Sequence, residues 1–394
     1  MRAAATATAV CCAAAGVGLA ALRAGHRAVA GPVPGYPRGL ALRGTIWPGG
    51  SADPFDGLLV VASDGTVARL GPPDLALPAD LPVLGGPGYW IGPGLVDAHV
   101  HLAFADPGEI LAKGVVGVRD LGAPPAVARQ WRTLGRPPAG SPSVAVAGPL
   151  ITAPGGYPSR SWGAAGFAAF ASSPAAARRL VADLVADGTD LIKIALEPGS
   201  GAPVPGPAEV RAVTESAHAA GLPVTAHALT AEMVSRALDA GVDELCHVPT
   251  ERLSPALAER IAASGIAVVS TLQTFFSDGQ GSAAGRNAIE LHRCGVPLLY
   301  GTDLGNAGTR PGADPRELDR LACAGLGRLG ALRAATEGSA GAVGMRGRTG
   351  RIAEGEAAAL VVLSGDPLIE PGVWHAPALV LADTHLSGPL TPHH

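Results

Sequence analysis

The sequence predicts an α/β fold: a (β/α)8 barrel of the TIM type with a small β-sandwich built from the two ends of the chain. Between residues 94 and 350, short apolar runs alternate eight times with Ala-, Arg- and Glu-rich helical stretches, as in parallel strands joined by crossover helices. Runs typical of antiparallel strands flank this region on both sides. The 394 residues are 47% hydrophobic and 16% charged, which excludes a disordered chain.

Residues 1–36 are predicted to form an extension that precedes the fold. Ala3–Leu22 carries no charge and is trailed by Ala28-Val29-Ala30, which resembles a signal peptide with its cleavage site. Charged residues such as Arg23 interrupt that pattern, and Ala, Thr and Gly are weak membrane formers. We therefore expect a disordered extension, no stable membrane span and a cytoplasmic protein, with export or membrane anchoring through residues 1–30 as the alternative.

The two ends of the chain share strand-like patterns. Residues 37–93 supply the first part of the predicted β-sandwich, where Asp64-Gly65 between two apolar runs is a strong hairpin signal. Residues 350–386 supply the second part, which includes the apolar run Ala359–Leu363. Residues 387–394 are expected to be a short tail.

The barrel is expected to occupy residues 94–349, a length typical of this architecture. Its predicted strands are Leu95–His101, Val115–Leu121, Val144–Ile151, Leu191–Leu196, Val224–Leu229, Val242–Val248, Ala267–Leu272 and Leu298–Asp303. Helices predicted between them include Ala175–Ala186, Pro207–Ala220, Ala231–Ala240 and Pro255–Ser264. Each of these helices is closely followed by a glycine, which is a common helix stop.

Charge and cysteine content narrow the choice of partners. The net charge of -4 lacks the basic excess of a nucleic-acid binder. The five cysteines include no C-x-x-C pair, which argues against a disulfide framework or a thiolate zinc cage and for a reducing compartment. A small-molecule substrate is the expected partner, and homo-oligomerisation is left open.

Four histidines and an aspartate lie towards the predicted carboxyl ends of barrel strands, the face that holds the site in such barrels. His99 and His101 end the first strand, and side-chain alternation turns both towards the barrel axis. His227, His247 and Asp303 belong to the fifth, sixth and eighth strands. An isolated H-x-H pair is more often two hydrogen-bonded core histidines. Five possible ligands at one face, four imidazoles and one carboxylate, instead predict a site for zinc or a similar metal.

Lys193 lies in the fourth apolar run, although only two of the 29 basic residues are lysines. An ammonium group would repel a metal ion, whereas a free amine can react with carbon dioxide to form a carbamate, an anionic ligand able to bridge two cations. The sequence therefore favours a carbamate on Lys193, with an ordinary ion-paired or snorkelling lysine as the alternative. Lys113 is expected to be solvated.

The candidate ligands other than His247 lie in motifs that resemble those of the amidohydrolase superfamily, in its imidazolonepropionase-like and prolidase-like branch. The motifs are Gly92-Pro93-Gly94-Leu95-Val96-Asp97-Ala98-His99-Val100-His101-Leu102, Val118-Arg119-Asp120-Leu121-Gly122, Asp190-Leu191-Ile192-Lys193-Ile194, Val224-Thr225-Ala226-His227-Ala228 and Gly301-Thr302-Asp303. The resemblance implies two divalent ions, zinc first and manganese, cobalt or iron as alternatives. The ligands that it implies are His99 and His101 for one ion, His227 and His247 for the other, carboxylated Lys193 as the bridge, and Asp303 as the metal-bound acid/base.

Two positions depart from this pattern. Gly155-Gly156-Tyr157 stands at the third strand, where many relatives carry a histidine after the glycine pair. Cys246 stands where an acidic residue is usual, and alternation predicts that its side chain faces the helices, so it is not counted as a ligand. We expect the first change to alter substrate choice and the second to alter only packing.

The implied function is hydrolysis of an amide C–N bond in a dipeptide, N-acyl amino acid or cyclic amide, through attack of a metal-bridging hydroxide. Asp303 would carry the proton to the leaving nitrogen, and Tyr157 would either donate a hydrogen bond to the oxyanion or only pack in its loop. Arg160 or Arg310 would clamp a substrate carboxylate unless both are ordinary surface residues. The alternatives are a lactone, ester or phosphotriester hydrolase with the same metal pair, and a non-catalytic metal-binding barrel.

Overall fold

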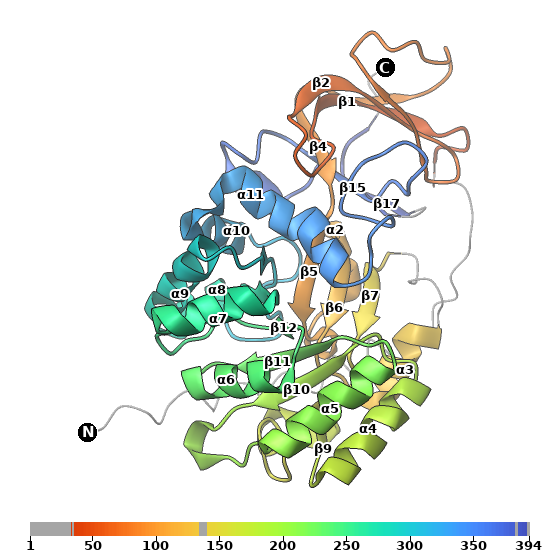
Figure 1. Ribbon diagram of the computed structural model, residues 1–394. Helices are drawn as coiled ribbons and strands as arrows, with labels where there is room; N and C mark the ends of the chain where they lie inside the picture. The colour runs from red at the N-terminus through yellow and green to blue at the C-terminus, as the bar shows by residue number, and fades with distance from the viewer. Residues whose placement is uncertain (1–32, 34, 134–139, 383–384, 392–394) are drawn as a thin grey trace.

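The computed structural model describes residues 33, 35–133, 140–382 and 385–391 (Figure 1). Most of the predicted N-terminal extension and the end of the predicted tail lie outside these residues. Within them, the middle of the chain forms a barrel with helices on its outside, and a separate sheet combines strands from both ends (Figure 1). The predicted α/β barrel is confirmed.

Eight parallel strand positions form the barrel in the described part of the chain. The strands are β5 (Leu95–Val100), β6 (Val115–Asp120), β7 (Ser143–Val146), β8 (Leu150–Thr152), β10 (Ile192–Leu196), β11 (Val224–Ala228), β12 (Glu244–Leu245), β13 (Ala267–Val269) and β14 (Leu298–Leu299). β7 and β8 share the third position, because β7 pairs with β6 and β8 pairs with β10. An additional strand, β9 (Ala168–Phe170), pairs with β8.

The barrel closes between β5 and the segment that follows β14. Ala98 N donates a hydrogen bond to Tyr300 O at 3.0 Å, and Asp303 N donates to His99 O at 2.9 Å. These bonds hold Asp303 beside the strand that carries His99.

The outer helices begin and end at the signals in the sequence. The ends of the four predicted helices agree with the structure to within one residue. The side chains of Ser173 and Ser254 each accept a hydrogen bond from a backbone N–H of the first helical turn, which otherwise has no partner within the helix. A proline follows each serine at the first helical position, where its missing N–H costs nothing. Gly241 and Gly265 end their helices in the left-handed conformation that glycine adopts without steric cost. The helices are α2 (Pro107–Ala112), α3 (Pro125–Thr133), α4 (Pro174–Ala186), α5 (Pro207–Ala219), α6 (Ala231–Ala240), α7 (Pro255–Ser264), α8 (Leu272–Ser277), α9 (Gly281–Arg293), α10 (Pro315–Leu321), α11 (Gly327–Arg333) and α12 (Ser339–Ala342).

Two barrel strands, β12 and β14, are shorter than predicted and have two residues each. His247 and Asp303 therefore lie in the loops after these strands, not within them, which corrects the prediction. The backbone there is unusual, since Asp303 has a φ of 55° and Thr271, after β13, a φ of 43°. Residues other than glycine rarely adopt this left-handed region, and such residues cluster at functional sites.

Strands from both ends form one mixed sheet, ordered β17-β16-β15-β4-β1-β2-β3. They are β1 (Leu40–Ile46), β2 (Phe55–Val61), β3 (Val67–Gly71), β4 (Val83–Pro93), β15 (Leu360–Leu363), β16 (Leu379–Ala382) and β17 (His385–Ser387). Buried side chains of β1 to β4 and of β15 and β16 share one apolar core. The predicted union of the two ends is confirmed. The strands belong to one hydrogen-bonded sheet, and the β-sandwich stays a prediction.

β4 leads directly into the barrel. Only Gly94 separates β4 from β5, and its N–H donates to Ala359 O at 3.0 Å. A side chain at residue 94 would collide with Val116 of β6, so the close approach of β6 requires glycine. This junction fixes the start of the strand that leads to His99.

Within the described residues, no helix is both long enough and apolar enough to cross a membrane. The signal-like or anchor-like segment within residues 1–30 lies outside the described part of the chain. The cytoplasmic location, the domain boundaries and the homo-oligomer therefore stay predictions. Cys246, Cys294 and Cys323 are free thiols.

Candidate metal centre

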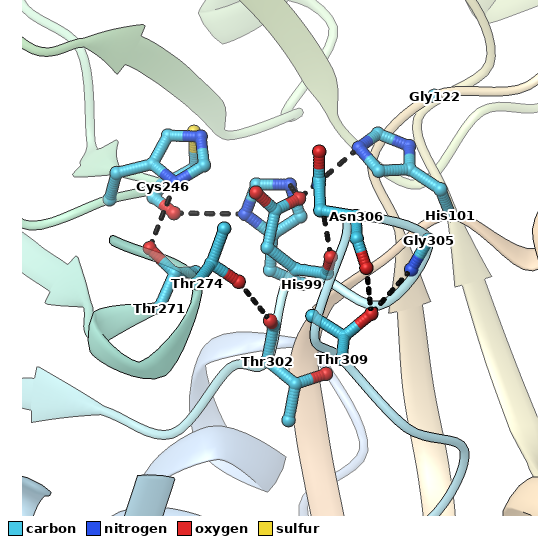
Figure 2. A network of polar contacts seen from close by, with 12 residues as sticks. His99, His101, Gly122, Cys246, Thr271, Thr274, Thr302, Gly305, Asn306 and Thr309 are labelled. Atoms are coloured by element: carbon cyan, nitrogen blue, oxygen red, sulfur yellow. Dashed lines mark hydrogen bonds and ion pairs between the residues drawn. The ribbon is translucent and has the colours of Figure 1, made fainter. Parts of the chain in front are cut away.

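The first group of predicted ligands gathers where β5 ends (Figure 2). His99 lies on β5 and His101 directly after it, and both imidazoles are buried. Their Nε2 atoms lie 3.2 and 3.5 Å from Asp303 Oδ1. Donor atoms of these three residues all lie within 4.8 Å of one another. They form a three-donor group of the kind that the sequence predicts.

A second group contains His99, His247 and Cys246, whose donor atoms also lie within 4.8 Å of one another. The Cys246 thiol is fully buried, and Lys193 Nζ lies 2.5 Å from its Sγ. This corrects the prediction that Cys246 faces the helices. Because β12 ends at Leu245, strand alternation does not determine the direction of the next side chain. The same contact places the Lys193 amine beside the donor atoms.

His227 extends the cluster from β11. Its ring centroid lies 4.7 Å from that of His247. Its Nε2 lies 3.1 Å from Glu197 Oε2, and a neutral ring that donates to this carboxylate keeps the Nδ1 lone pair for another ligand. Sequence reasoning missed Glu197. The available signal was an acidic residue directly after β10, at the barrel face where the other site residues lie.

Two further contacts orient the histidines. His99 Nδ1 lies 2.9 Å from the carbonyl oxygen of Cys246 (Figure 2). His247 Nδ1 lies 2.9 Å from Thr271 Oγ1. In both rings the contact engages Nδ1 and leaves Nε2 for a metal ion. A hydrogen bond to one ring nitrogen is the usual way in which a neighbouring group orients a metal-binding imidazole. Thr271 is a second residue that sequence reasoning missed.

Asp97 organises the backbone beneath the site. Its Oδ1 accepts the N–H groups of His99 at 3.0 Å and Thr302 at 3.1 Å, and its Oδ2 accepts the Thr302 hydroxyl at 2.5 Å. Burial raises the pKa of the Asp97 carboxyl to about 7, although these hydrogen bonds lower it. Asp97 therefore ties β5 to the loop that carries Asp303.

Burial determines the protonation of two imidazoles and the thiol. It lowers the pKa of His99 well below its usual value, and the neighbouring Lys193 and His247 lower it further. Burial and His227 likewise lower the pKa of His247. Both rings are therefore neutral near pH 7, the form that binds a metal ion. Burial raises the pKa of the Cys246 thiol to about 11, so this thiol keeps its proton unless a bound cation displaces it.

The donor set fits a divalent transition metal. Neutral imidazole nitrogens, a carboxylate and a thiol gather in one buried cluster, and zinc binds these three kinds of ligand. The first group combines two histidines with Asp303, and the second joins His247 and Cys246 to His99.

An aromatic group covers part of the site. The Trp162 ring lies 4.9 Å from that of His101, and its Nε1 donates to the Tyr157 hydroxyl at 3.0 Å. The Tyr157 ring lies 5.3 Å from that of His227, so the predicted tyrosine lies beside the cluster. Trp162 was not singled out from the sequence.

The two predicted arginines lie on the surface, in loops after barrel strands. Arg160 is exposed in the loop after β8, with its guanidinium close to Gly155. Arg310 is exposed in the loop after β14.

Known proteins resemble this chain in sequence and in fold. Imidazolonepropionases from Shewanella species are 50% identical over 50 residues, a segment that is 12% of this chain and 12% of each relative. A putative prolidase from Bifidobacterium longum superposes with a TM-score of 0.76 at 27% identity, covering 91% of this chain and 97% of the prolidase.

Two more distant structures share the fold. A Xaa-Pro dipeptidase with bound methionine has a TM-score of 0.76 at 21% identity, covering 89% of this chain and all of the dipeptidase. The ochratoxinase of A. niger has a TM-score of 0.73 at 21% identity, covering 89% of this chain and 96% of the ochratoxinase. The sequence profile of the amidohydrolase family matches residues 139–388, more than half of the chain. The chain therefore belongs to the amidohydrolase family, and its barrel has the fold of these hydrolases.

Proposed function

We propose that this chain is a metal-dependent hydrolase that cleaves the amide C–N bond of a small carboxylate-bearing molecule, such as a dipeptide, an N-acyl amino acid or a cyclic amide. The observation that carries the proposal is the buried cluster of His99, His101 and Asp303 beside His247, at the carboxyl ends of the barrel strands. Membership of the amidohydrolase family and the prolidase-like neighbour at 27% identity support C–N bond hydrolysis.

In this proposal the cluster binds two divalent ions, for which zinc is preferred. The ligands are His99, His101 and Asp303 for one ion, His227 and His247 for the other, and a carbamate on Lys193 as the bridge. When bound, such ions lower the pKa of a water molecule and polarise the substrate carbonyl. The Lys193 amine supports the bridge because it is buried and reaches the donor cluster through Cys246.

Asp303 moves the proton during the reaction. Its carboxylate lies beside both imidazoles of the first group, so it is well placed to accept a proton from the attacking water and return it to the leaving nitrogen. An amide nitrogen leaves readily only after protonation. This requirement favours an amide over an activated ester as the substrate of a site with such a carboxylate.

Tyr157 and the loop arginines recognise the substrate. The Tyr157 hydroxyl donates a hydrogen bond to the developing oxyanion, and the proximity of its ring to His227 supports this role. Arg160 or Arg310 binds the substrate carboxylate through a bidentate contact. Both lie in loops that follow barrel strands, on the face that holds the site in such barrels, and this position supports the role.

Metal content per chain tests the centre directly. The protein is purified with bicarbonate and without chelator, and the wild type is compared with Lys193→Ala and with Lys113→Ala. Lys113 is the matched control because its exposed amine pairs with Glu109 at 2.6 Å, outside the donor cluster. About two equivalents in the wild type and the control, with a loss in Lys193→Ala, are expected. One equivalent unaffected by the substitution would remove Lys193 from the site, and no metal would overturn the mechanism.

A substrate panel tests the reaction class. Dipeptides, N-acyl amino acids and cyclic amides are compared with lactones, esters and phosphotriesters on fully metallated protein. We expect the amides to be cleaved fastest, and Asp303→Asn to abolish turnover while the exposed Asp319→Asn retains it. Faster cleavage of lactones or phosphotriesters would assign the site to those substrates. Inactivity across the panel would favour a non-catalytic metal-binding barrel.

A further inference from the structure

The buried Cys246 thiol has no part in the proposed reaction. Its Sγ lies within 4.8 Å of donor atoms of both His99 and His247. Cys246 and His247 are adjacent in the chain, and both are at most 4% exposed. The thiol is therefore part of a cluster of nitrogen and sulfur donors and is not an isolated cysteine.

The backbone holds the thiol in this position. Cys246 N donates to Ala226 O of β11 at 3.0 Å, and Cys246 O lies 2.9 Å from His99 Nδ1. The main chain of this one residue thus connects to β11 and to the first ligand strand, β5. Thr271 engages Nδ1 of the neighbouring His247, which leaves Nε2 on the side available to a ligand.

Lys193 supplies the remaining contact, with Nζ 2.5 Å from Cys246 Sγ. A carbamate formed on this amine would carry its oxygen atoms close to the same sulfur. An ion held by the carbamate and His247 would consequently lie beside the sulfur as well.

We propose that the Cys246 sulfur is itself a ligand of the second ion, beside His247, a proposal that rests on the metal centre described under the proposed function. Binding breaks the S–H bond, and the proton leaves to solvent while the sulfur lone pair is donated to the cation. A thiolate is a soft ligand, which zinc, cobalt and cadmium accept better than manganese or magnesium. The second position therefore prefers zinc-like ions.

The test uses the full chain loaded with each metal alone. In the cobalt(II) protein, a sulfur ligand produces a strong thiolate-to-metal charge-transfer absorption in the near ultraviolet. In the zinc protein, X-ray absorption detects a sulfur neighbour at about 2.3 Å. Cys246→Ser is compared with the matched control Cys323→Ser, whose thiol is exposed. The zinc measurement needs no variant, so a folding defect in Cys246→Ser leaves the proposal testable.

We expect the charge-transfer band and the zinc–sulfur distance in the wild type and in Cys323→Ser, and loss of the band in Cys246→Ser. Removal of a direct ligand should weaken zinc binding by roughly tenfold or more, since loss of a supporting hydrogen-bond partner alone costs about that much. Manganese binding should change much less. Two bound zinc ions with no sulfur neighbour would overturn this proposal and leave the proposed function intact. A protein that binds no metal would overturn both.

Discussion

His227 Nε2 lies 3.1 Å from Glu197 Oε2 across the carboxyl ends of two neighbouring strands, β11 and β10. The carboxylate is one-fifth exposed and the imidazole about one-tenth. The pair fixes the ring orientation and the tautomer of a proposed metal ligand. Burial raises the pKa of Glu197, but the hydrogen bond and charge of His227 and the backbone N–H of Gly199 lower it, and the net shift is downwards.

Replacement of Glu197 by Gln should therefore weaken the second metal position without removing a ligand. The neutral amide accepts a weaker hydrogen bond, and we expect zinc affinity there to fall about 10-fold to 100-fold. Competitive titration with a chromophoric chelator measures this change. Glu232→Gln, on the exposed face of α6, is the control. Equal affinities in the two variants would show that the ring orientation does not depend on Glu197.

Removal of the Tyr157 hydroxyl should lower kcat and leave metal content unchanged. If the phenol stabilises the oxyanion, Tyr157→Phe should reduce kcat about 100-fold, as the loss of one oxyanion donor does. Steady-state kinetics and elemental analysis on the same preparation separate the two effects. Tyr89→Phe, in the terminal sheet, is the control. An unchanged kcat would restrict Tyr157 to packing against Trp162 and His227.

Neutral replacements of the loop arginines should raise KM for acidic substrates. We expect either Arg160→Gln or Arg310→Gln to increase KM about tenfold or more with little change in kcat, because a carboxylate clamp contributes binding to both ground and transition states. Arg178→Gln, exposed on α4, controls for the loss of one positive charge. Equal KM values for an acidic amide and its neutral analogue in the wild type would contradict the role.

Arg119 and Glu244 form a buried ion pair inside the barrel, with Nη2 2.5 Å from Oε1. Arg119 Nε also donates to Ala98 O at 2.8 Å, and Thr225 Oγ1 donates to Glu244 at 2.7 Å. Arg119→Met should destabilise the protein by about 3–5 kcal/mol, because it leaves a carboxylate buried without its partner. Urea unfolding measures the loss.

A second substitution distinguishes the contribution of the ion pair to stability from the contribution of Arg119 packing. Glu244→Gln combined with Arg119→Met removes the uncompensated charge, so the double variant should be more stable than Arg119→Met alone. If the two single losses simply add in the double variant, the ion pair is not coupled and the prediction is wrong.

Glu317 should make stability depend on pH. Its carboxylate accepts the N–H groups of Leu272 and Gln273 at the start of α8, and burial raises its pKa to about 7 from 4.5. The folded state therefore binds an extra proton between these values. The resulting stabilisation is complete below pH 4.5 and is lost as the pH rises through 7, a change of about 3 kcal/mol.

Comparison with Glu317→Gln isolates this effect. The variant loses one acceptor and starts less stable at low pH, but it does not titrate. The stability advantage of the wild type should therefore shrink between pH 5 and pH 8 in urea unfolding curves. Glu370→Gln, which changes an exposed glutamate, should show a constant difference. A constant difference for Glu317→Gln as well would contradict the raised pKa.

The barrel and its first ligand group were predictable because they follow local rules. Ser-Pro starts and glycine stops are set by backbone hydrogen bonding within a few residues. α4 and α7 begin at such a start, and α6 and α7 end at such a stop. His99 lies on a strand of six residues, long enough for alternation to determine which face its side chain occupies.

Contacts between loops could not be predicted in this way. Cys246 follows a strand of only two residues, so its direction depends on hydrogen bonds to β11 and to His99, which are distant in sequence. Glu197, Thr271 and Trp162 each contact an imidazole that another strand or loop supplies. The sequence places Glu197 and Thr271 near strand ends, but it does not specify which imidazole each of the three residues contacts.

The position of β4 in the terminal sheet has a consequence for how the protein is made. β4 pairs with β1 on one side and with β15 on the other, and the whole barrel is translated between β4 and β15. At a translation rate of about 5–20 residues per second, the edge of β4 that pairs with β15 stays unpaired for a time on the order of tens of seconds. An unpaired apolar strand edge is a template for aggregation. A chain that stops before residue 360 would keep this edge exposed, however complete its barrel.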